Sequence, residues 1–192
     1  MTYWKRIFIS IILLFGLASI GLTEDDSLRY FLAKSSSKSM ELSNKERAEL
    51  LNRLEEMMKR VQRIHKNLIQ ALQTGETDIR YQEGKFWMSK LEEDRGSIAM
   101  GMQQLKLLKE KPMHLVASIK LYKSLRDLSS NFNAYNNISS FSAVIGDLAP
   151  EMELWGDPVF YKLYLLPLAD SKEMKAKPPQ KEKTPIPKGK KP

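Results

Sequence analysis

Residues 43–75 read SNKERAELLNRLEEMMKRVQRIHKNLIQALQTG and carry the longest regular pattern in the chain. Ser43 and Glu46 have the spacing of a capping box, in which each side chain accepts a hydrogen bond from the backbone N–H of the other residue. Gly75 can end the helix in a left-handed backbone conformation. Apolar residues recur between these signals in steps of three and four, the period of one helical face: Leu50, Leu51, Leu54, Met57, Met58, Val61, Ile64, Leu68 and Leu72. The stretch therefore predicts a helix over 44–74.

The same periodicity continues through two more segments. The second runs from a cap at Thr77 or Asp78 to about Glu110. It contains three glycines, which indicate close approach of a neighbouring helix or a weakly held region: Gly84, Gly96 and Gly101. The third starts at Pro112, a residue suited to the first turn of a helix, and continues to about Ile138. Since very few residues connect these two segments, we expect the three long helices to run antiparallel.

Helix breakers interrupt the pattern in the last third of the sequence. Asp157 and Pro158 match the N-cap and first residue of a short amphipathic helix that would end before Pro167. We expect two or three short helical pieces over about 140–169, and no stretch has the period of two that predicts a strand. The predicted fold is all-α: an antiparallel up-down bundle of three long helices, closed by a broken fourth helical segment, in a domain over 43–171.

The N-terminus has the order of an export signal. Met1–Arg6 is short and basic, and Ile7–Leu22 is uncharged and is followed at once by acidic residues. The uncharged run is shorter than the roughly 20 apolar residues of a typical membrane span. We interpret 1–21 as a signal peptide or a signal anchor and 22–42 as a linker. In either case the domain is expected to be exported, to a periplasmic or extracellular location, and an uncleaved segment would be its membrane contact.

The chain has 192 residues and a formal net charge of +8, which is unevenly distributed. The segment 172–192 holds eight lysines, two glutamates and five prolines, and we predict a disordered, extended basic tail. Residues 22–171 carry equal numbers of basic and acidic side chains, which argues against nucleic acid as a partner. The tail is expected either to reach an anionic surface, an acidic polymer or an acidic protein, or to act as a solubilising extension.

The composition excludes several kinds of chemistry. With no cysteine, the chain has no thiolate metal site, disulfide or cysteine nucleophile. His65 and His114 lack metal-ligating residues at neighbouring helical positions, and we interpret both as surface or boundary residues. The acidic run 92–94 is interpreted as an exposed helical face. We therefore predict a protein that is not an enzyme, with no catalytic residues, no cofactor and no metal. Asn137 begins an Asn-Ile-Ser glycosylation acceptor, relevant only in a eukaryotic source.

Two sets of residues are candidates for partner binding. Aromatic residues cluster beside the helix breakers, and adjacent helical residues point in different directions, so they cannot all face one core. The aromatic set is Trp155, Phe160, Tyr161 and Tyr164, and the tail set is Lys181, Lys183, Lys188, Lys190 and Lys191. The alternative interpretation of the aromatic set is that it closes one end of the bundle.

These observations predict an exported, non-catalytic cell-envelope protein that acts through protein–protein contacts, with the tail binding an anionic surface or partner. The alternative is a periplasmic small-ligand or metal-binding module, sensor-like or chaperone-like, with a pocket near Trp87, Met102 and Trp155. The apolar helical faces can close within one chain or between chains, so the sequence leaves a homo-oligomer open.

Overall fold

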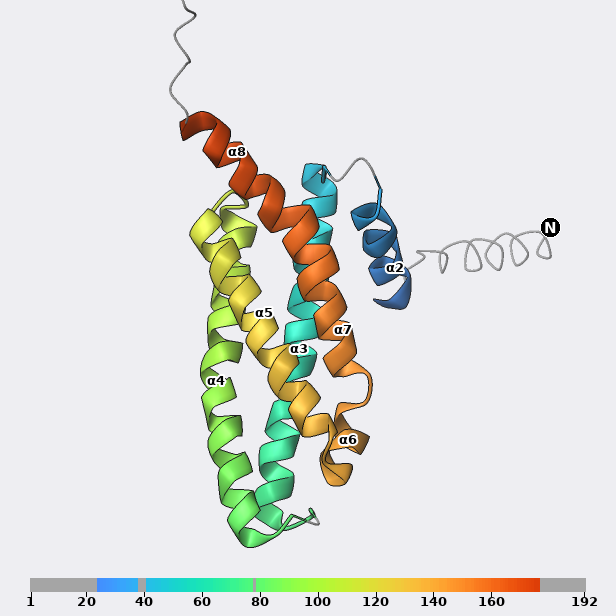
Figure 1. Cartoon of the computed structure of the whole chain (residues 1–192), viewed down its shortest axis with the longest axis vertical. Helices are drawn as coiled ribbons and strands as arrows, with labels where there is room; N and C mark the ends of the chain where they lie inside the picture. Colours follow the sequence, from blue (N-terminus) through green and yellow to red (C-terminus); the bar gives the residue numbers. More distant parts are fainter. Residues whose placement is uncertain (1–23, 38–40, 78, 177–192) are drawn as a thin grey trace, which may run out of the picture.

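The computed structural model describes residues 24–37, 41–77 and 79–176, and every regular element in that part of the chain is helical. In chain order these are α2 (Glu24–Ser35), α3 (Asn44–Thr74), α4 (Tyr81–Glu110), α5 (Leu115–Asn136), α6 (Ser139–Ile145), α7 (Leu148–Leu154), η1 (Trp155–Leu165) and α8 (Leu166–Ala176) (Figure 1). The predicted all-α class is confirmed. The predicted signal segment, 1–21, lies outside the described residues.

None of the helices in the described ranges has both the length and the apolar composition that a membrane span requires.

Helix α3 forms as its sequence predicts. The Ser43 hydroxyl accepts from the Glu46 backbone N–H at 3.3 Å, and the Glu46 carboxylate accepts from the Ser43 backbone N–H at 2.8 Å. At the other end, Gly75 has φ of 71°, a left-handed conformation that glycine adopts without steric cost. Most of the predicted apolar face is buried, and the predicted members Ile64 and Leu72 are partly buried against the same core.

Helices α4 and α5 both begin later than predicted. Helix α4 starts at Tyr81, with Arg80 at its N-cap and no side-chain cap, so Thr77 does not start it; Asp78 lies outside the described residues. Helix α5 starts three residues after Pro112, because His114 takes the N-cap position. Its ring Nδ1 accepts from the Ala117 backbone N–H at 3.1 Å. The end of α4 at Glu110 is as predicted.

Figure 1 shows α3 and α4 lying side by side and running in opposite directions, with α5 packed along α4. Gly101 on α4 lies close to both neighbouring helices, because a Cβ atom there would lie 2.8 Å from Met58 Cε on α3 and 3.4 Å from Ser124 Cβ on α5. The predicted close approach is confirmed at this glycine. At Gly84 and Gly96 an added Cβ atom would have no neighbour nearer than 4.0 Å, so close approach does not apply there and the other alternative, a weakly held region, stays a prediction.

The chain from Leu148 to Ala176 is one continuous helical run and not a set of short pieces, although α6 before it is short. The middle of the run, η1, has π-helical hydrogen bonding; at its end the Leu166 N–H bonds to the Tyr161 carbonyl, five residues earlier. The predicted interruption of the helix is therefore confirmed at 146–147, between α6 and α7, and is wrong at Asp157 and Pro167, which lie inside the run. Helix α8 also extends five residues into the predicted extended tail.

Pro158 explains part of this geometry. Asp157 and Pro158 lie inside η1, where they were expected to start a new helix. In an α-helix a proline ring clashes with the carbonyl four residues earlier. The wider π turn, which bonds five residues apart, relieves that contact and lets the helix continue.

The segment 22–42 was predicted as a linker, but it contains a packed helix, α2. Phe31 is 1 % exposed, and its ring centroid lies 6.0 Å from that of Trp155 in η1. Tyr30 and Lys34 both donate to the Glu46 carboxylate at the start of α3. The Ser- and Lys-rich composition near 34–39 led to the linker prediction, whereas the apolar residues of α2 decide its packing.

Candidate functional site

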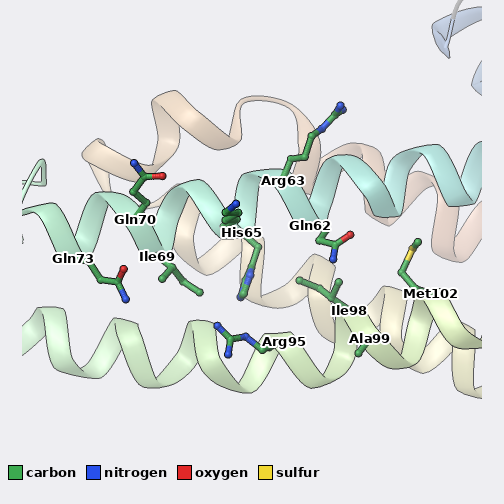
Figure 2. A pocket seen from close by; sticks show the side chains of 11 residues that line it. Gln62, Arg63, His65, Ile69, Gln70, Gln73, Arg95, Ile98, Ala99 and Met102 are labelled. Atoms are coloured by element: carbon green, nitrogen blue, oxygen red, sulfur yellow. The ribbon is translucent and has the colours of Figure 1, made fainter.

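A groove of about 900 Å³ lies between α3 and α4 (Figure 2). Its lining residues all come from these two helices: Gln62, Arg63, His65, Lys66, Ile69, Gln70 and Gln73 from α3, and Arg95, Ile98, Ala99 and Met102 from α4. The α3 residues span about 17 Å at 1.5 Å per residue, which is about three helical turns. The groove is therefore elongated along the helix pair.

The floor of the groove is apolar and its edges are polar. Figure 2 shows Gln62, Ile69 and Gln73 extending from α3 toward α4, with Ile98 and Met102 opposite them. Ile69 and Ile98 are buried, whereas Gln62 and Gln73 are exposed. The short side chain of Ala99 leaves space between the two helices. This combination suits a ligand with one apolar face and one polar face.

The rim of the groove is cationic. Arg63 and Lys66 are exposed on α3, and Arg95 is exposed on α4. Arg95 pairs with Glu92 at 3.1 Å, a surface ion pair of small energetic value. Among the lining residues that the structure describes, none is acidic. The groove thus favours a ligand that carries negative charge.

His65 lies in the wall of the groove and is buried, so its interpretation as a surface or boundary residue is wrong. Its Nε2 lies 2.6 Å from the Leu91 carbonyl oxygen, which is an acceptor only, so Nε2 carries the proton. The bond fixes the ring across the α3–α4 interface. His114 instead caps α5 and is half-buried.

A buried carboxylate, Asp94, lies between α4 and α5. Tyr135 donates its hydroxyl to Asp94 Oδ2 at 2.5 Å, and Asn131 donates its amide to Asp94 Oδ1 at 2.6 Å. Burial raises the pKa of the Asp94 carboxyl, and these two hydrogen bonds oppose the rise. Burial and the bond to Asp94 also raise the pKa of the Tyr135 hydroxyl. Because both carboxylate oxygens are satisfied, we interpret this cluster as structural.

The two polar groups described above, His65 and Asp94, are occupied by hydrogen bonds within the fold. No group of three histidine, aspartate or glutamate side chains in the described ranges could hold a metal ion. His65 is bonded to a backbone carbonyl, and Asp94 is enclosed by its two donors. What the groove can do is bind, through its apolar floor and cationic rim.

The predicted aromatic set is largely internal. Trp155, Phe160 and Tyr164 are at most 4 % exposed, so these three close the core and do not form a surface. Phe160 and Tyr164 stack with ring centroids 5.0 Å apart. Only Tyr161 is exposed, beside Tyr122 at a centroid distance of 5.2 Å. The burial of these three rings favours the alternative interpretation, in which they close the bundle, and partner binding by the aromatic set stays a prediction.

Tyr164 links distant parts of the chain. Its hydroxyl donates to the Pro112 carbonyl at 2.7 Å, and the Arg47 guanidinium lies 5.5 Å from its ring centroid, within cation–π range. Burial raises the pKa of Tyr164 to about 12. The predicted tail residues Lys181, Lys183, Lys188, Lys190 and Lys191 lie outside the described residues.

The pocket expected near Trp87, Met102 and Trp155 does not bring these residues together. Met102 lines the α3–α4 groove, and Trp155 is enclosed in the core beside Phe31. Trp87 packs edge-on against Tyr135, fifteen residues and about 22 Å along α4 from Met102. The groove was missed because its position depends on how α3 and α4 align.

The Asp94 cluster was also missed, since Asp94 was grouped with its exposed neighbours in the acidic run 92–94. Its position offered a signal: Asp94 falls three residues after Leu91 and four before Ile98, both on the buried face of α4. A carboxylate in an apolar stripe needs hydrogen-bond donors. Asn131 and Tyr135, four residues apart on α5, supply them.

Comparison of this chain with protein-family models, with curated proteins and with solved structures finds no match.

Proposed function

We propose that this protein is an exported, non-catalytic adaptor of a cell envelope that binds an acidic amphipathic helix of a partner protein in the α3–α4 groove. In this proposal the three long helices form an antiparallel up-down bundle that presents the groove. The observation that carries it is the cationic rim above an apolar floor, extended along two neighbouring helices. Export follows from the N-terminal sequence pattern.

The shape of the groove favours a helical ligand. An amphipathic helix binds a groove through residues spaced three and four apart, and three turns match the length that the α3 residues span. Ile69, Ile98 and Met102 would contact the apolar face of such a helix. A third helix laid between α3 and α4 packs by the same ridge-and-groove rules as the helices already present.

The charge of the groove favours an acidic ligand. Lys66 and Arg95 lie on opposite sides of it, so a bound helix with carboxylates along both edges would meet a cation on each side. Arg63 lies further out; Figure 2 shows its side chain pointing away from α4. Complementary charges of this kind raise association rates and exclude basic competitors more than they add affinity.

A designed peptide tests the proposal on the full chain. The ligand is a fluorescent helical peptide with leucine at every third and fourth position and glutamate on its other face. A peptide of the same composition with scrambled leucines is its control. Binding is followed by fluorescence anisotropy. We expect the amphipathic peptide to bind more tightly than the scrambled one, because only it can cover the apolar floor.

Charge reversal locates the binding. The double variant Lys66→Glu/Arg95→Glu should bind the amphipathic peptide at least about tenfold more weakly, since like charges then face each other across the interface. Lys120→Glu, on α5 and away from the groove, should leave affinity unchanged. Equal binding by the double variant, or equal binding of the scrambled peptide, would reject the proposal. A stoichiometric small molecule or metal that copurifies with the chain would favour a small-ligand module instead.

The proposed export of the protein is tested separately. N-terminal sequencing of the mature protein from its source cells should give a start near residue 22 for a cleaved signal, or Met1 in the membrane fraction for an anchor. Recovery of Met1-bearing protein from the cytosol would reject export.

A further inference from the structure

The connection between α4 and α5 carries an exposed apolar surface. Met113, Val116 and Ile119 are 52 %, 56 % and 49 % exposed, which places them among the most exposed large apolar side chains in the described residues. Val116 and Ile119 are three residues apart at the start of α5 and so share a face. Met113 and Val116 also line a shallow, open depression formed by residues 111–116.

The exposed apolar surface continues onto the helical run from Leu148 to Ala176. Tyr161 packs beside Tyr122, and Tyr164 bonds to the Pro112 carbonyl, so this part of the run lies against the start of α5. Tyr161 and Leu166 are both exposed and five residues apart, which is the repeat of a π turn. We call the group the turn end; it consists of Met113, Val116, Ile119, Tyr161 and Leu166.

Lysines accompany the turn end. Lys111, Lys120 and Lys162 are exposed: Lys120 and Lys162 directly follow Ile119 and Tyr161, and Lys111 lies two residues before Met113. Lys123 pairs with Asp127, and the exposed acids near the turn end include Glu41, which lines a pocket with Met113, as well as Glu110 and Asp170. Figure 1 shows α8 leaving the bundle at the end where α4 meets α5. In the sequence, 172–192 holds eight lysines and two glutamates, and its first five residues belong to α8.

We propose that the turn end docks on the surface of an anionic lipid bilayer, with its apolar side chains between the headgroups and its lysines at the phosphates. Apolar residues with flanking lysines are the composition of interfacial membrane contacts, and tyrosine is favoured at that depth. Lysine stems lie along apolar surface while their ammonium groups reach the headgroups. The exposed lysines beside these apolar side chains favour the phosphates of an anionic bilayer.

This inference does not rest on the groove, which lies elsewhere on α3 and α4, and it goes beyond the proposed adaptor function by naming the surface that holds the adaptor. Membrane contact was expected from an uncleaved N-terminal segment alone. The turn end adds a contact made by the folded part.

Site-specific fluorescence tests it on the full chain, which has no native cysteine. Val116→Cys and Ile119→Cys are labelled with an environment-sensitive dye, and Val144→Cys on α6 is the control, since Val144 is also exposed but lies outside the turn end. The probes are vesicles of equal parts phosphatidylglycerol and phosphatidylcholine, and vesicles of phosphatidylcholine alone. Because every variant has the same N-terminus, a signal confined to α5 reports the turn end itself.

We expect the dyes at 116 and 119 to shift to shorter wavelength with anionic vesicles only, and the dye at 144 to stay unchanged. In the double variant Lys111→Gln/Lys120→Gln, the apparent affinity for anionic vesicles should fall by about fivefold for each lysine replaced. Added salt should also lower this affinity. An equal shift at 144, or none at 116 and 119, would overturn the proposal. A shifted spectrum before vesicles are added would overturn it too, because another part of the chain then covers the turn end.

Discussion

Helix α3 and the run from Leu148 to Ala176 are both long helical stretches, but different interactions determine them. The ends of α3 are set by its own residues, through the Ser43–Glu46 capping box and the left-handed Gly75. The run contains π-helical turns and passes through a proline, and its order comes from contacts with α2 and α5. A helix specified by local signals is readable from sequence, whereas one specified by packing is not.

The largest expected effect comes from removing a core side chain of the run. Trp155→Ala should lower the free energy of unfolding by about 4 kcal/mol, because it leaves a cavity beside Phe31 in the core. Urea denaturation measures the loss. Hydrogen exchange should show protection lost first over 148–165, with α3 retained. Trp155→Phe keeps the ring packing and removes an indole N–H that has no partner, so it should cost less.

If Trp155→Ala reduced protection in α3 as much as in the run, the two regions would be one cooperative unit and the contrast would fail.

A smaller test removes the polar attachment of η1 to α5. Asp157 accepts from the Tyr122 hydroxyl at 2.6 Å and from Arg126 at 2.5 Å. Asp157→Ala should cost about 1.5 kcal/mol, since it leaves the half-buried Tyr122 hydroxyl without its acceptor. Asp127→Ala, which breaks only the exposed pair with Lys123, should change stability by at most about 0.5 kcal/mol. Thermal denaturation of both variants makes the comparison; equal effects would mean that Asp157 does no more than a surface acid.

On the α3 side, Ser43→Ala should cost about 1 kcal/mol, because the Glu46 backbone N–H loses its acceptor. Ser43→Gly should cost only a few tenths, since glycine is tolerated at this position. Denaturant titration separates the two. A cost near zero for Ser43→Ala would show that packing, and not the cap, determines where α3 begins.

The smallest effect is a pH dependence at the same cap. Hydrogen bonds from Lys34, Tyr30 and Ser43 hold the pKa of the Glu46 carboxyl well below its ordinary value of 4.5. A lowered folded-state pKa stabilises the fold above pH 4.5, and this contribution is lost as the pH falls below it. Glu46→Gln should therefore be less stable than the native chain at pH 7 and closer to it at pH 3. Asp94 is present in both the native chain and Glu46→Gln, so the difference in their free energies of unfolding reports Glu46. A difference that does not change with pH would contradict the prediction.

The sequence predicted α3 to the residue, because its cap, its apolar period and its final glycine all agree. It failed at Asp157-Pro158, where a true N-cap signature occurs but the carboxylate is used by Tyr122 and Arg126 on another helix. The start of α5 failed for a related reason: Pro112 suits a first turn, but His114 provides the cap. In both cases the sequence contains a genuine helix-start signal, but another residue or contact determines where the helix begins.

The candidate site was harder to predict from the sequence than the helices were. Its lining residues are ordinary surface positions on two helices, and only the alignment of α3 with α4 gathers Lys66, Arg95 and the isoleucines around one groove. Trp155, Phe160 and Tyr164 were singled out correctly as unusual, but their aromatic surplus fills the core against α2, a helix that the linker prediction omitted.

The π turns of η1 also determine how helix α8 is rotated about its own axis. Each such turn takes about one residue more than an α turn, so two or three of them rotate the following helix by roughly half a turn relative to an uninterrupted α-helix. That offset puts Leu168 inside and Leu166 outside. Deleting a single residue from η1 would keep the composition nearly intact, yet it would turn Leu166 and Leu168 of α8 toward different surroundings.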